Sequence, residues 1–307
     1  MKILFCTDGS EISFNAIENI SKWITNATVD IICVTDWSFL PDEINIEEEN
    51  FTYSCARIAS TILDFATDKI NNLGMVSKEE INGCGSAIDN ILEQTKKEHY
   101  DLIVMGSHGK KGIQKWLGSV SQEIINSSKN SCYVAKEIND TKRLLITTDG
   151  TECSNSIVES IIPNLNLQDK EIHVCMVNDD PNLLFLDGTL DTQWVLDIQK
   201  RQYAYATKVI NEIKKILAKY NYENVKSSIL TGNPAQEIIN YTEKNKIDLC
   251  LLGSHEKSKL EKFLIGSVSK RVLENSTCDV LLARCKKIDP NIEWCNNKLM
   301  YYSKYTP

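Results

Sequence analysis

The same phrase occurs twice in this chain, and the repeat limits what the chain can fold into. GSHGKKGIQKWLGSVS begins at Gly106, and GSHEKSKLEKFLIGSVS begins at Gly253. Each phrase follows an apolar run that opens with Asp-Leu, at Asp101 and at Asp248, and both pairs are separated by 147 positions. A glycine-rich turn that leaves a strand and ends in Gly-Ser at a helix start is suited to holding phosphate. The sequence therefore predicts two copies of one anion-binding unit.

Length and composition narrow the class of protein. A chain of 307 residues predicts about two domains, and 42% hydrophobic with 25% charged residues is ordinary for a globular protein. The formal net charge of −8 disfavours nucleic acid and anionic membranes as partners. The opening MKILFCTDGS is typical of a first strand rather than a signal peptide, and no apolar run approaches a membrane span. We therefore expect a cytoplasmic protein.

The cysteines and histidines give no sign of a disulfide framework or a metal site. The chain has 11 cysteines, an odd number, and several lie in apolar runs, among them Cys6, Cys33, Cys175 and Cys250. No CxxC pair occurs, so buried, reduced thiols are expected, with a redox-sensing thiol as the alternative. Four histidines without ligand spacing do not predict zinc.

Apolar runs alternate with amphipathic stretches in the same order in both halves. Strands are predicted in the first half at 2–7, 30–34, 75–81 (weak), 101–105 and 132–136, and in the second at 144–148, 171–177, 225–230, 248–252 and 279–283. Helices are predicted from 8–13 onward to 24 and at 56–73, 86–98 and 119–127, then around 157–162, at 194–220 and from Pro234 onward. The polar stretch 36–50 is predicted to be a loop.

Buried strands that alternate with helices predict a parallel sheet covered on both faces. The chain is thus expected to form two doubly wound, Rossmann-like, five-stranded parallel sheets in tandem, as domains at 1–139 and 142–285, followed by a tail at 286–307 whose role stays open. The short join at about 137–141 predicts closely placed domains. Ligands of such sheets bind beyond the strand carboxyl ends, so Thr7–Asp8 and Gly106–Ser121 should converge if the first and fourth strands are neighbours.

Over about residues 1–285 the sequence resembles the universal stress protein family in its tandem two-domain form. The resemblance rests on the strand followed by Asp-Gly-Ser/Thr, the GNPAQEII helix opening, the Asp-led strand with its Gly-Ser turn, and the terminal GSVS. It implies the adenine nucleotide alpha hydrolase-like fold and, in some members, binding of ATP, with or without magnesium. It also implies that the tandem chain is an intrachain pseudo-dimer, and it leaves a homodimer open.

ATP-binding members of that family carry Gly, two residues, Gly, nine residues and Gly-Ser/Thr, and each half here departs from this pattern once. The first half has only eight residues between Gly109 and Gly118. The second has Glu256 in place of the second Gly. A carboxylate about 6 Å from a phosphate would repel it by roughly 3 kcal/mol at an effective dielectric of about 20, although it could instead hold a metal ion. We therefore rank the first site above the second.

The resemblance, carried across position by position, implies a set of contacts in each half. In the first half, the adenosine contacts would be Thr7, Asp8, Val34, Met105 and Gly106, and the phosphate contacts would be Gly109, Gly118, Ser119, Val120 and Ser121. In the second half, the equivalents are Thr148, Asp149, Val177, Leu252, Gly253, Gly266, Ser267, Val268 and Ser269.

Several of these residues have a structural alternative. Asp8 and Asp149 could simply cap the first helix of each half, and Ser119 with Gln122 resembles a capping box. Gly106 and Gly253 could serve only the exit from the strand. The flanking lysines are expected on a solvated surface more than at the phosphates: Lys110, Lys111 and Lys115. His108 and His255 are expected on the surface or in the core rather than in a catalytic role.

Motifs of the main nucleotide-dependent enzymes are absent from the sequence. It has no GxxxxGK[ST] P-loop, no GxGxxG fingerprint and no GxSxG elbow, and TDGSEIS and TDGTECS stand where related ATP pyrophosphatases carry SGGxDS. We expect an ATP-binding regulatory protein of the stress response that acts on an unidentified protein partner. A scaffold with degenerate sites is the alternative, and a hydrolase with more than slow, incidental ATP hydrolysis is disfavoured.

Overall fold

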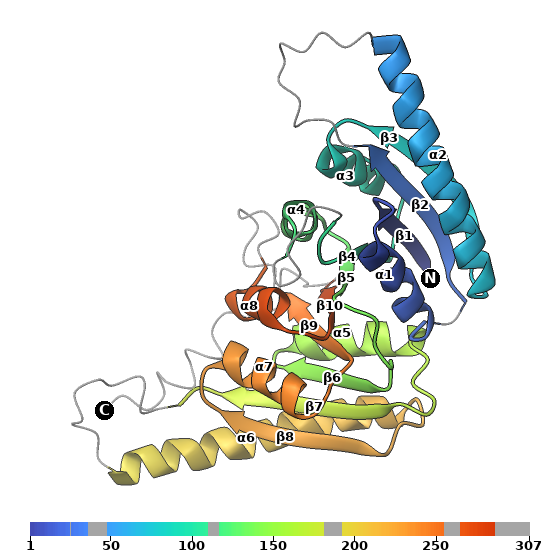
Figure 1. The fold of residues 1–307 in the computed structure, drawn as a ribbon. Coiled ribbons are helices and arrows are strands. Elements are labelled where there is room, and N and C mark those ends of the chain that lie inside the picture. Colours follow the sequence, from blue (N-terminus) through green and yellow to red (C-terminus); the bar gives the residue numbers. More distant parts are fainter. Residues whose placement is uncertain (25, 36–47, 110–116, 181–191, 255–264, 286–307) are drawn as a thin grey trace.

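The computed structural model describes residues 1–24, 26–35, 48–109, 117–180, 192–254 and 265–285, with no account of the side chains at 48–55 and 192 (Figure 1). The first half contains β1 (Lys2–Thr7), α1 (Glu11–Ser21), β2 (Thr28–Thr35), α2 (Glu48–Asn72), β3 (Val76–Cys84), α3 (Ala87–Lys97), β4 (Leu102–Gly106), α4 (Ser119–Ser127) and β5 (Ser131–Ala135). The second contains β6 (Arg143–Thr148), α5 (Glu152–Ile161), the 3-10 turn η1 (Ile162–Asn164), β7 (Glu171–Asn178), α6 (Thr192–Ala218), β8 (Val225–Thr231), α7 (Pro234–Lys244), β9 (Leu249–Ser254), α8 (Ser267–Asn275) and β10 (Asp279–Arg284).

The strands form one ten-stranded sheet in the order β3-β2-β1-β4-β5-β10-β9-β6-β7-β8. Within each half all pairings are parallel, and β1 lies between β2 and β4. This confirms the predicted fold class and the neighbouring first and fourth strands. β5 and β10 pair antiparallel, so the two five-stranded halves are joined edge to edge.

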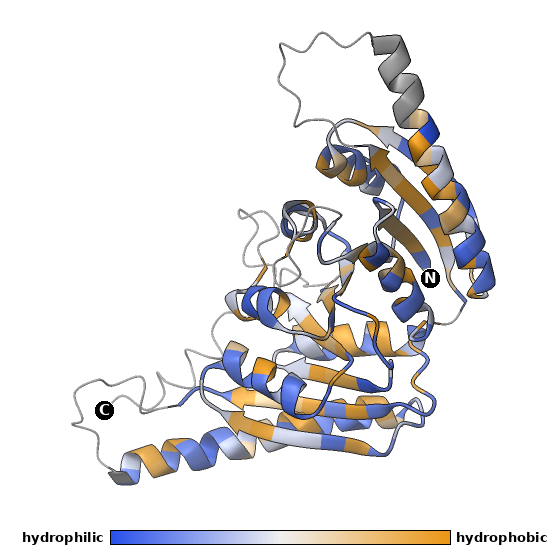
Figure 2. Cartoon of the chain, viewed as in Figure 1, coloured by the Kyte–Doolittle hydropathy of each residue, from blue (hydrophilic) through white to orange (hydrophobic). Residues whose placement is uncertain are grey.

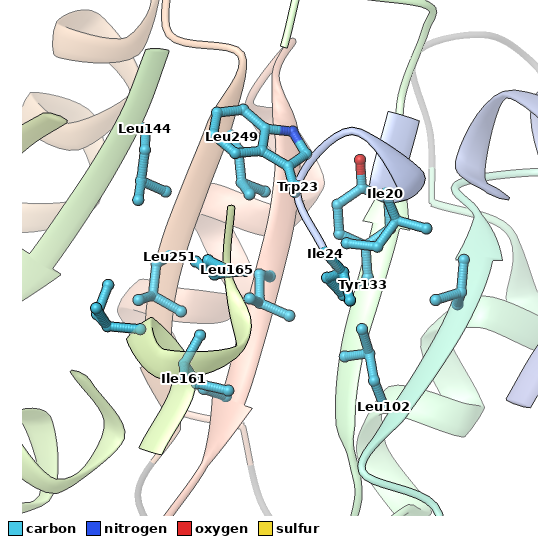
Figure 3. Close-up of a cluster of buried hydrophobic side chains, with 14 of the residues drawn as sticks. Ile20, Trp23, Ile24, Leu102, Tyr133, Leu144, Ile161, Leu165, Leu249 and Leu251 are labelled. Carbon is cyan, nitrogen blue, oxygen red and sulfur yellow. The ribbon is translucent and has the colours of Figure 1, made fainter. Parts of the chain in front are cut away.

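The joint is arranged around a pseudo-twofold axis. Tyr133 of β5 pairs with Leu281 of β10, and the two residues hold equivalent positions in the repeat. Ile24, after α1, likewise forms an antiparallel bridge with its own equivalent, Leu165. Figure 3 shows Tyr133, Ile24 and Leu165 together with Trp23 in one apolar cluster between the halves. Equivalent residues that meet each other are what a two-fold dimer interface produces, so the chain is built as an intrachain pseudo-dimer.

Each face of the sheet has its own apolar core because successive strand side chains point to opposite faces. Ile3 and Phe5 of β1 belong to the apolar cluster on the face that carries α1, α2, α5 and α6, whereas Leu4 and Cys6 belong to the cluster on the face that carries α3, α4, α7 and α8. Figure 2 shows apolar strands inside and mixed, largely hydrophilic surfaces along the two long helices α2 and α6. Both faces are covered, as the continuous apolar strands predicted.

Two sequence-based boundaries were wrong. Helix α2 already begins at Glu48, within the stretch 36–50 that was predicted to be a loop, while 36–47 lie outside the described residues. The weak strand predicted at 75–81 is a full strand of nine residues, β3. It forms an outer edge of the sheet, and its exposed Lys78 and Glu79 suit an edge that must not pair with another chain. The tail 286–307 lies outside the described residues.

Most of the described cysteines are buried. Among the described cysteines, Cys84 is exposed and the other eight are buried. Burial raises the pKa of Cys132 and Cys175 to about 12, which keeps these thiols protonated and unreactive at neutral pH.

No helix within the described part of the chain is long and apolar enough to cross a bilayer.

Candidate functional site

The predicted first-half site lies at the carboxyl ends of β1 and β4. Thr7, the last residue of β1, is buried, and its hydroxyl lies 2.8 Å from Ser13 Oγ and accepts the Gly9 N–H at 3.1 Å. Gly9 has φ of +75°, a value that glycine adopts without strain. The second half repeats this turn, with Thr148 Oγ1 accepting the Gly150 N–H at 3.1 Å and Gly150 at φ +80°. The threonine hydroxyls therefore shape the turn that presents Asp8 and Asp149.

Asp8 supports the start of α1 without capping it. Its Oδ1 accepts the N–H of Ser10 at 3.0 Å, and the cap itself is Ser10, whose Oγ accepts the N–H of Ser13 at 3.3 Å. In the second half the N-cap of α5 is Thr151, whose Oγ1 accepts the N–H of Ser154 at 3.3 Å. The alternative in which Asp8 and Asp149 cap these helices is therefore wrong. Each aspartate instead accepts a hydrogen bond from the backbone N–H of the N-cap residue, Ser10 or Thr151.

The turn after β4 approaches Asp8 closely. A Cβ added to Gly109 would lie 2.6 Å from Asp8 Oδ2, so a side chain at this position would collide with the carboxylate. Gly106 is equally enclosed, because a Cβ there would lie 2.9 Å from Ile12 Cγ2. The structure thus brings Asp8 and Gly109 together from two strands, as predicted. Close packing against Ile12 of α1 requires glycine at position 106 whether or not a ligand binds.

Helices α4 and α8 begin differently from the other capped helices. The N-cap side chain accepts a first-turn N–H in α1, α3, α5 and α7, from Ser10, Ser86, Thr151 and Asn233 respectively. In α4 and α8 the N-cap is Gly118 or Gly266, which has no side chain to accept such a bond. Their first-turn N–H groups are left without an N-cap acceptor, at the end where the helix dipole is positive. This arrangement suits an anion.

The serines of the two GSVS segments divide into two roles. Ser119 and Ser267 are exposed as the first residues of α4 and α8, so Ser119 is not the N-cap and the predicted capping box is wrong. Ser121 is buried, and its hydroxyl donates to the Gly106 carbonyl at 2.9 Å. Ser269 donates to Gly253 at 2.8 Å in the same manner. The hydroxyl proton of each second serine is used within the protein, leaving its backbone N–H for a ligand.

The remaining predicted residues lie beside this turn or in the core below it. Val120 and Val268 are half-buried in α4 and α8, and Val34 and Val177 are half-buried near the ends of β2 and β7. The side chains of Met105 and Leu252 are buried in the core, so a ligand could meet these two residues mainly through their backbone. His108 is half-buried with Nδ1 3.0 Å from Ser107 Oγ. The other flanking residues lie outside the described residues: Lys110, Lys111, Lys115, His255 and Glu256.

The second-half turn is covered by a residue that the sequence did not single out. Tyr205 of α6 donates its hydroxyl to the Gly150 carbonyl at 3.0 Å, and its ring lies where a Cβ on Gly150 would be. Asp149 Oδ1 there accepts three bonds, from the Thr151 N–H, the Thr151 hydroxyl and the Ser154 hydroxyl. When the buried residues Ala59 of α2 and Ala206 of α6 are aligned, Ile58 takes the position in the first half that Tyr205 takes in the second. The first half therefore has no hydroxyl at that position.

Among the described residues no group of three or more His, Cys, Asp or Glu side chains is arranged to hold a metal ion. The polar atoms of the first-half turn are instead backbone N–H groups, hydroxyls and one carboxylate. Such a set can bind a phosphate and a polar nucleoside, but the described part of it offers no paired base that would activate water.

Comparisons with known proteins agree with the doubled architecture. The model of the universal stress protein family matches residues 1–136 and again residues 140–284. The chain belongs to the universal stress protein family. It is a tandem member, with one family unit in each half of the joined sheet.

Relatives and a solved structure match one or both halves of the chain. Universal stress protein Slr1230 of Synechocystis is 24% identical over 312 residues, which covers 92% of this chain and 99% of that protein. Universal stress protein MJ0531 of Methanocaldococcus jannaschii is 30% identical over 146 residues, covering 48% of this chain and 84% of its own length. A crystal structure of a universal stress protein from Archaeoglobus fulgidus superposes with a TM-score of 0.66 at 21% identity, covering 92% of this chain and 98% of that one, which shows the shared fold.

Proposed function

We propose that this tandem universal stress protein is a regulatory protein that binds ATP, or another adenine nucleotide, at the first-half site. The observation that carries the proposal is the start of α4 at Gly118. No side chain of the N-cap residue occupies the first-turn N–H groups there, whereas four other helices are capped in this way. Among the described residues, no N-cap side chain occupies this positive helix end, which lies next to the turn where Asp8 meets Gly109.

The phosphates are proposed to accept from the backbone N–H groups of Ser119, Val120 and Ser121 and from the exposed Ser119 hydroxyl. The nucleoside would then lie toward the ends of β1 and β2, where the carboxylate of Asp8 can accept from ribose or adenine and half-buried Val34 offers an apolar surface. Magnesium, if present, would be held by the phosphates more than by the protein, as is usual for this ion.

The second-half site is proposed to bind more weakly. Tyr205 lies on Gly150, and the Asp149 oxygen nearest the helix already accepts three hydrogen bonds. A nucleoside would have to displace the tyrosine and compete for the carboxylate. Both effects add to the repulsion expected from Glu256, so the first site keeps the higher rank.

The proposed role is regulatory because nothing in the described turn activates water. Domains at 1–139 and 142–285 would act as one body through the shared sheet, and nucleotide in the first site would change the surface offered to a protein partner. A scaffold without nucleotide is the second candidate. It is favoured by Thr7 and Ser121, whose hydroxyls are engaged inside the protein.

Isothermal titration of the full chain with ATP, with and without magnesium, tests the proposal. Gly118→Asp should remove more than half of the binding, because it places a carboxylate at the open helix end. Gly266→Asp is the corresponding change in the second half and should have the smaller effect on ATP binding. The added Cβ has its nearest neighbour at 4.0 Å at Gly266 and at 3.3 Å, His108 Cα, at Gly118, so the folded state of both variants is checked by their unfolding in urea. Absence of heat with the wild-type chain would favour the scaffold, and loss of binding only with Gly266→Asp would reverse the ranking of the sites.

A further inference from the structure

A buried arginine lies at the joint between the halves. Arg284 is the last residue of β10 and only 6% of its surface is exposed. Its backbone N–H donates to Ser131 Oγ of β5 at 3.1 Å, across the antiparallel strand pair. Burying a guanidinium is costly unless its donors are satisfied, so the contacts that this side chain makes are informative.

The guanidinium of Arg284 joins the two candidate sites. Its Nη1 donates to Ser254 Oγ at 3.1 Å, and its Nη2 donates to the Ile125 carbonyl. Ser254 ends β9 and directly follows Gly253, a predicted contact of the second site. Ile125 belongs to α4, whose other end is the proposed phosphate site of the first half. One side chain thus bonds the strand end of one site and the phosphate helix of the other.

The position of the charge suits this connection. Helix α4 has nine residues, which is about 13 Å of axial length. Its carboxyl end carries partial negative charge and holds the guanidinium, while its amino end carries partial positive charge and faces the proposed anion. Helix α4 is thus the route by which a displacement at Ser254 would reach the amides of Ser119 and Val120 through Arg284.

The equivalent residue in the first half makes a simpler contact. Lys136 holds the position of Arg284 in the repeat, and its Nζ donates at 2.7 Å to the Leu273 carbonyl of α8, the equivalent of Ile125. The hydroxyl of Ser107, the equivalent of Ser254, lies 3.0 Å from His108 Nδ1 in its own turn. An ammonium is a single point charge, whereas a guanidinium has a fork of donors that can hold two partners at once. The connection is therefore asymmetric.

We propose that Arg284 is a positioning residue that makes the nucleotide affinity of the first site depend on the strand end of the second site at Ser254. This inference rests on the proposed function. Coupling between two sites is reciprocal, so a nucleotide bound at α4 would also alter the order of the end of β9 at Ser254.

Titration with ATP in a Gly266→Asp background, where only the first site is counted, tests the proposal. Ser254→Ala, which alters no first-half residue, should weaken ATP binding by about fivefold or more, the lower end of typical coupling. Arg284→Lys, which keeps the charge and loses the fork, should weaken it similarly, and the double variant should be no worse than Arg284→Lys alone. Lys136→Met is the control and should leave the affinity within twofold of its background. Additive effects, or an unchanged affinity with Ser254→Ala, would overturn the proposal.

Amide hydrogen exchange of the full chain without nucleotide separates failure of the coupling from failure of the proposed function. Ser254→Ala and Arg284→Lys should each speed exchange in 119–127 by about fivefold, while Lys136→Met should act on 267–275 instead. If ATP does not bind but these changes occur, the connection stands and the nucleotide proposal fails. Unchanged exchange in 119–127 with both variants would overturn the connection itself.

Discussion

The phenol of Tyr133 donates a hydrogen bond to the carboxylate of Asp279 across the joint between the two halves. Asp279 has no exposed surface, and its oxygens also accept from Asn19 Nδ2 at 2.9 Å, Asn139 Nδ2 at 2.8 Å and the Lys136 N–H at 2.8 Å. The carboxylate therefore ties α1, β5 and the linker to β10. Its equivalent in the first half is Ser131, so only one half of the joint contains a buried acid.

We predict that Asp279 makes the stability of the chain depend on pH between about 4 and 6. Burial raises the pKa of Asp279 to about 6, although hydrogen bonds from Tyr133 and Lys136 act to lower it. The folded chain keeps this proton to a higher pH than the unfolded chain does. The contribution of Asp279 to the free energy of unfolding therefore falls by about 3 kcal/mol as the pH rises through this window, and it is constant above the window.

The matched variant is Asp279→Ser, which copies the residue of the other half. The difference in unfolding free energy between wild type and variant, from urea titrations at several pH values, should decrease from pH 4 to pH 6. Groups that titrate alike in the two proteins contribute equally to both unfolding free energies, so their contributions cancel in this difference. A flat or rising difference would contradict the buried, desolvated carboxylate.

The second serine of each GSVS segment is predicted to be structural. Ser121→Ala and Ser269→Ala each remove a donor from the strand-end carbonyl of Gly106 or Gly253, which should cost about 1–3 kcal/mol of unfolding free energy when the acceptor stays buried. Ser127→Ala is the control on the exposed surface of α4 and should change stability by less than about 0.5 kcal/mol. Equal stabilities in urea titrations would mean that these hydroxyls are available to a ligand.

Tyr205 and Gly150 are predicted to be energetically coupled. Gly150→Ala combines a left-handed backbone, with φ of +80°, and a collision with the tyrosine ring, whereas Gly74→Ala has φ of +76° and no atom within 4 Å of the new Cβ. Gly74→Ala should cost about 1–2 kcal/mol for the backbone alone. Gly150→Ala should cost more in the wild-type chain and about the same as Gly74→Ala in a Tyr205→Ala background. If Gly150→Ala destabilises the chain equally with and without Tyr205→Ala, the tyrosine ring moves aside at no energetic cost and the predicted coupling is absent.

The repeated phrase and the apolar runs predict most of the fold, because buried parallel strands and amphipathic helices have clear periodicities. The strand pair β5–β10 could not be predicted, since both strands are continuous apolar runs and look the same whether they lie at an edge or in a joined sheet. Strand β3 was underestimated for the opposite reason: as an outer edge it carries Lys78 and Glu79 in place of apolar residues.

Two glycines of the candidate site could be singled out from the sequence, because close approach of the backbone requires glycine. Gly109 and Gly118 stand where a Cβ would meet Asp8 or His108. The helix caps were misassigned because Asp8, Ser10 and Ser13 are all possible caps within six residues, and only the geometry of the turn selects Ser10. Tyr205 and Arg284 gave no sequence signal, because their partners lie 55 and 30 or more positions away.

The most direct test of nucleotide binding at α4 is the backbone amide NMR spectrum of the full chain during addition of ATP. The amide resonances of Ser119, Val120 and Ser121 should shift strongly and saturate with ATP, while those of Ser267, Val268 and Ser269 should shift less. Unchanged amide resonances at the start of α4, at ATP concentrations in the millimolar range typical of weak sites, would contradict a nucleotide site there.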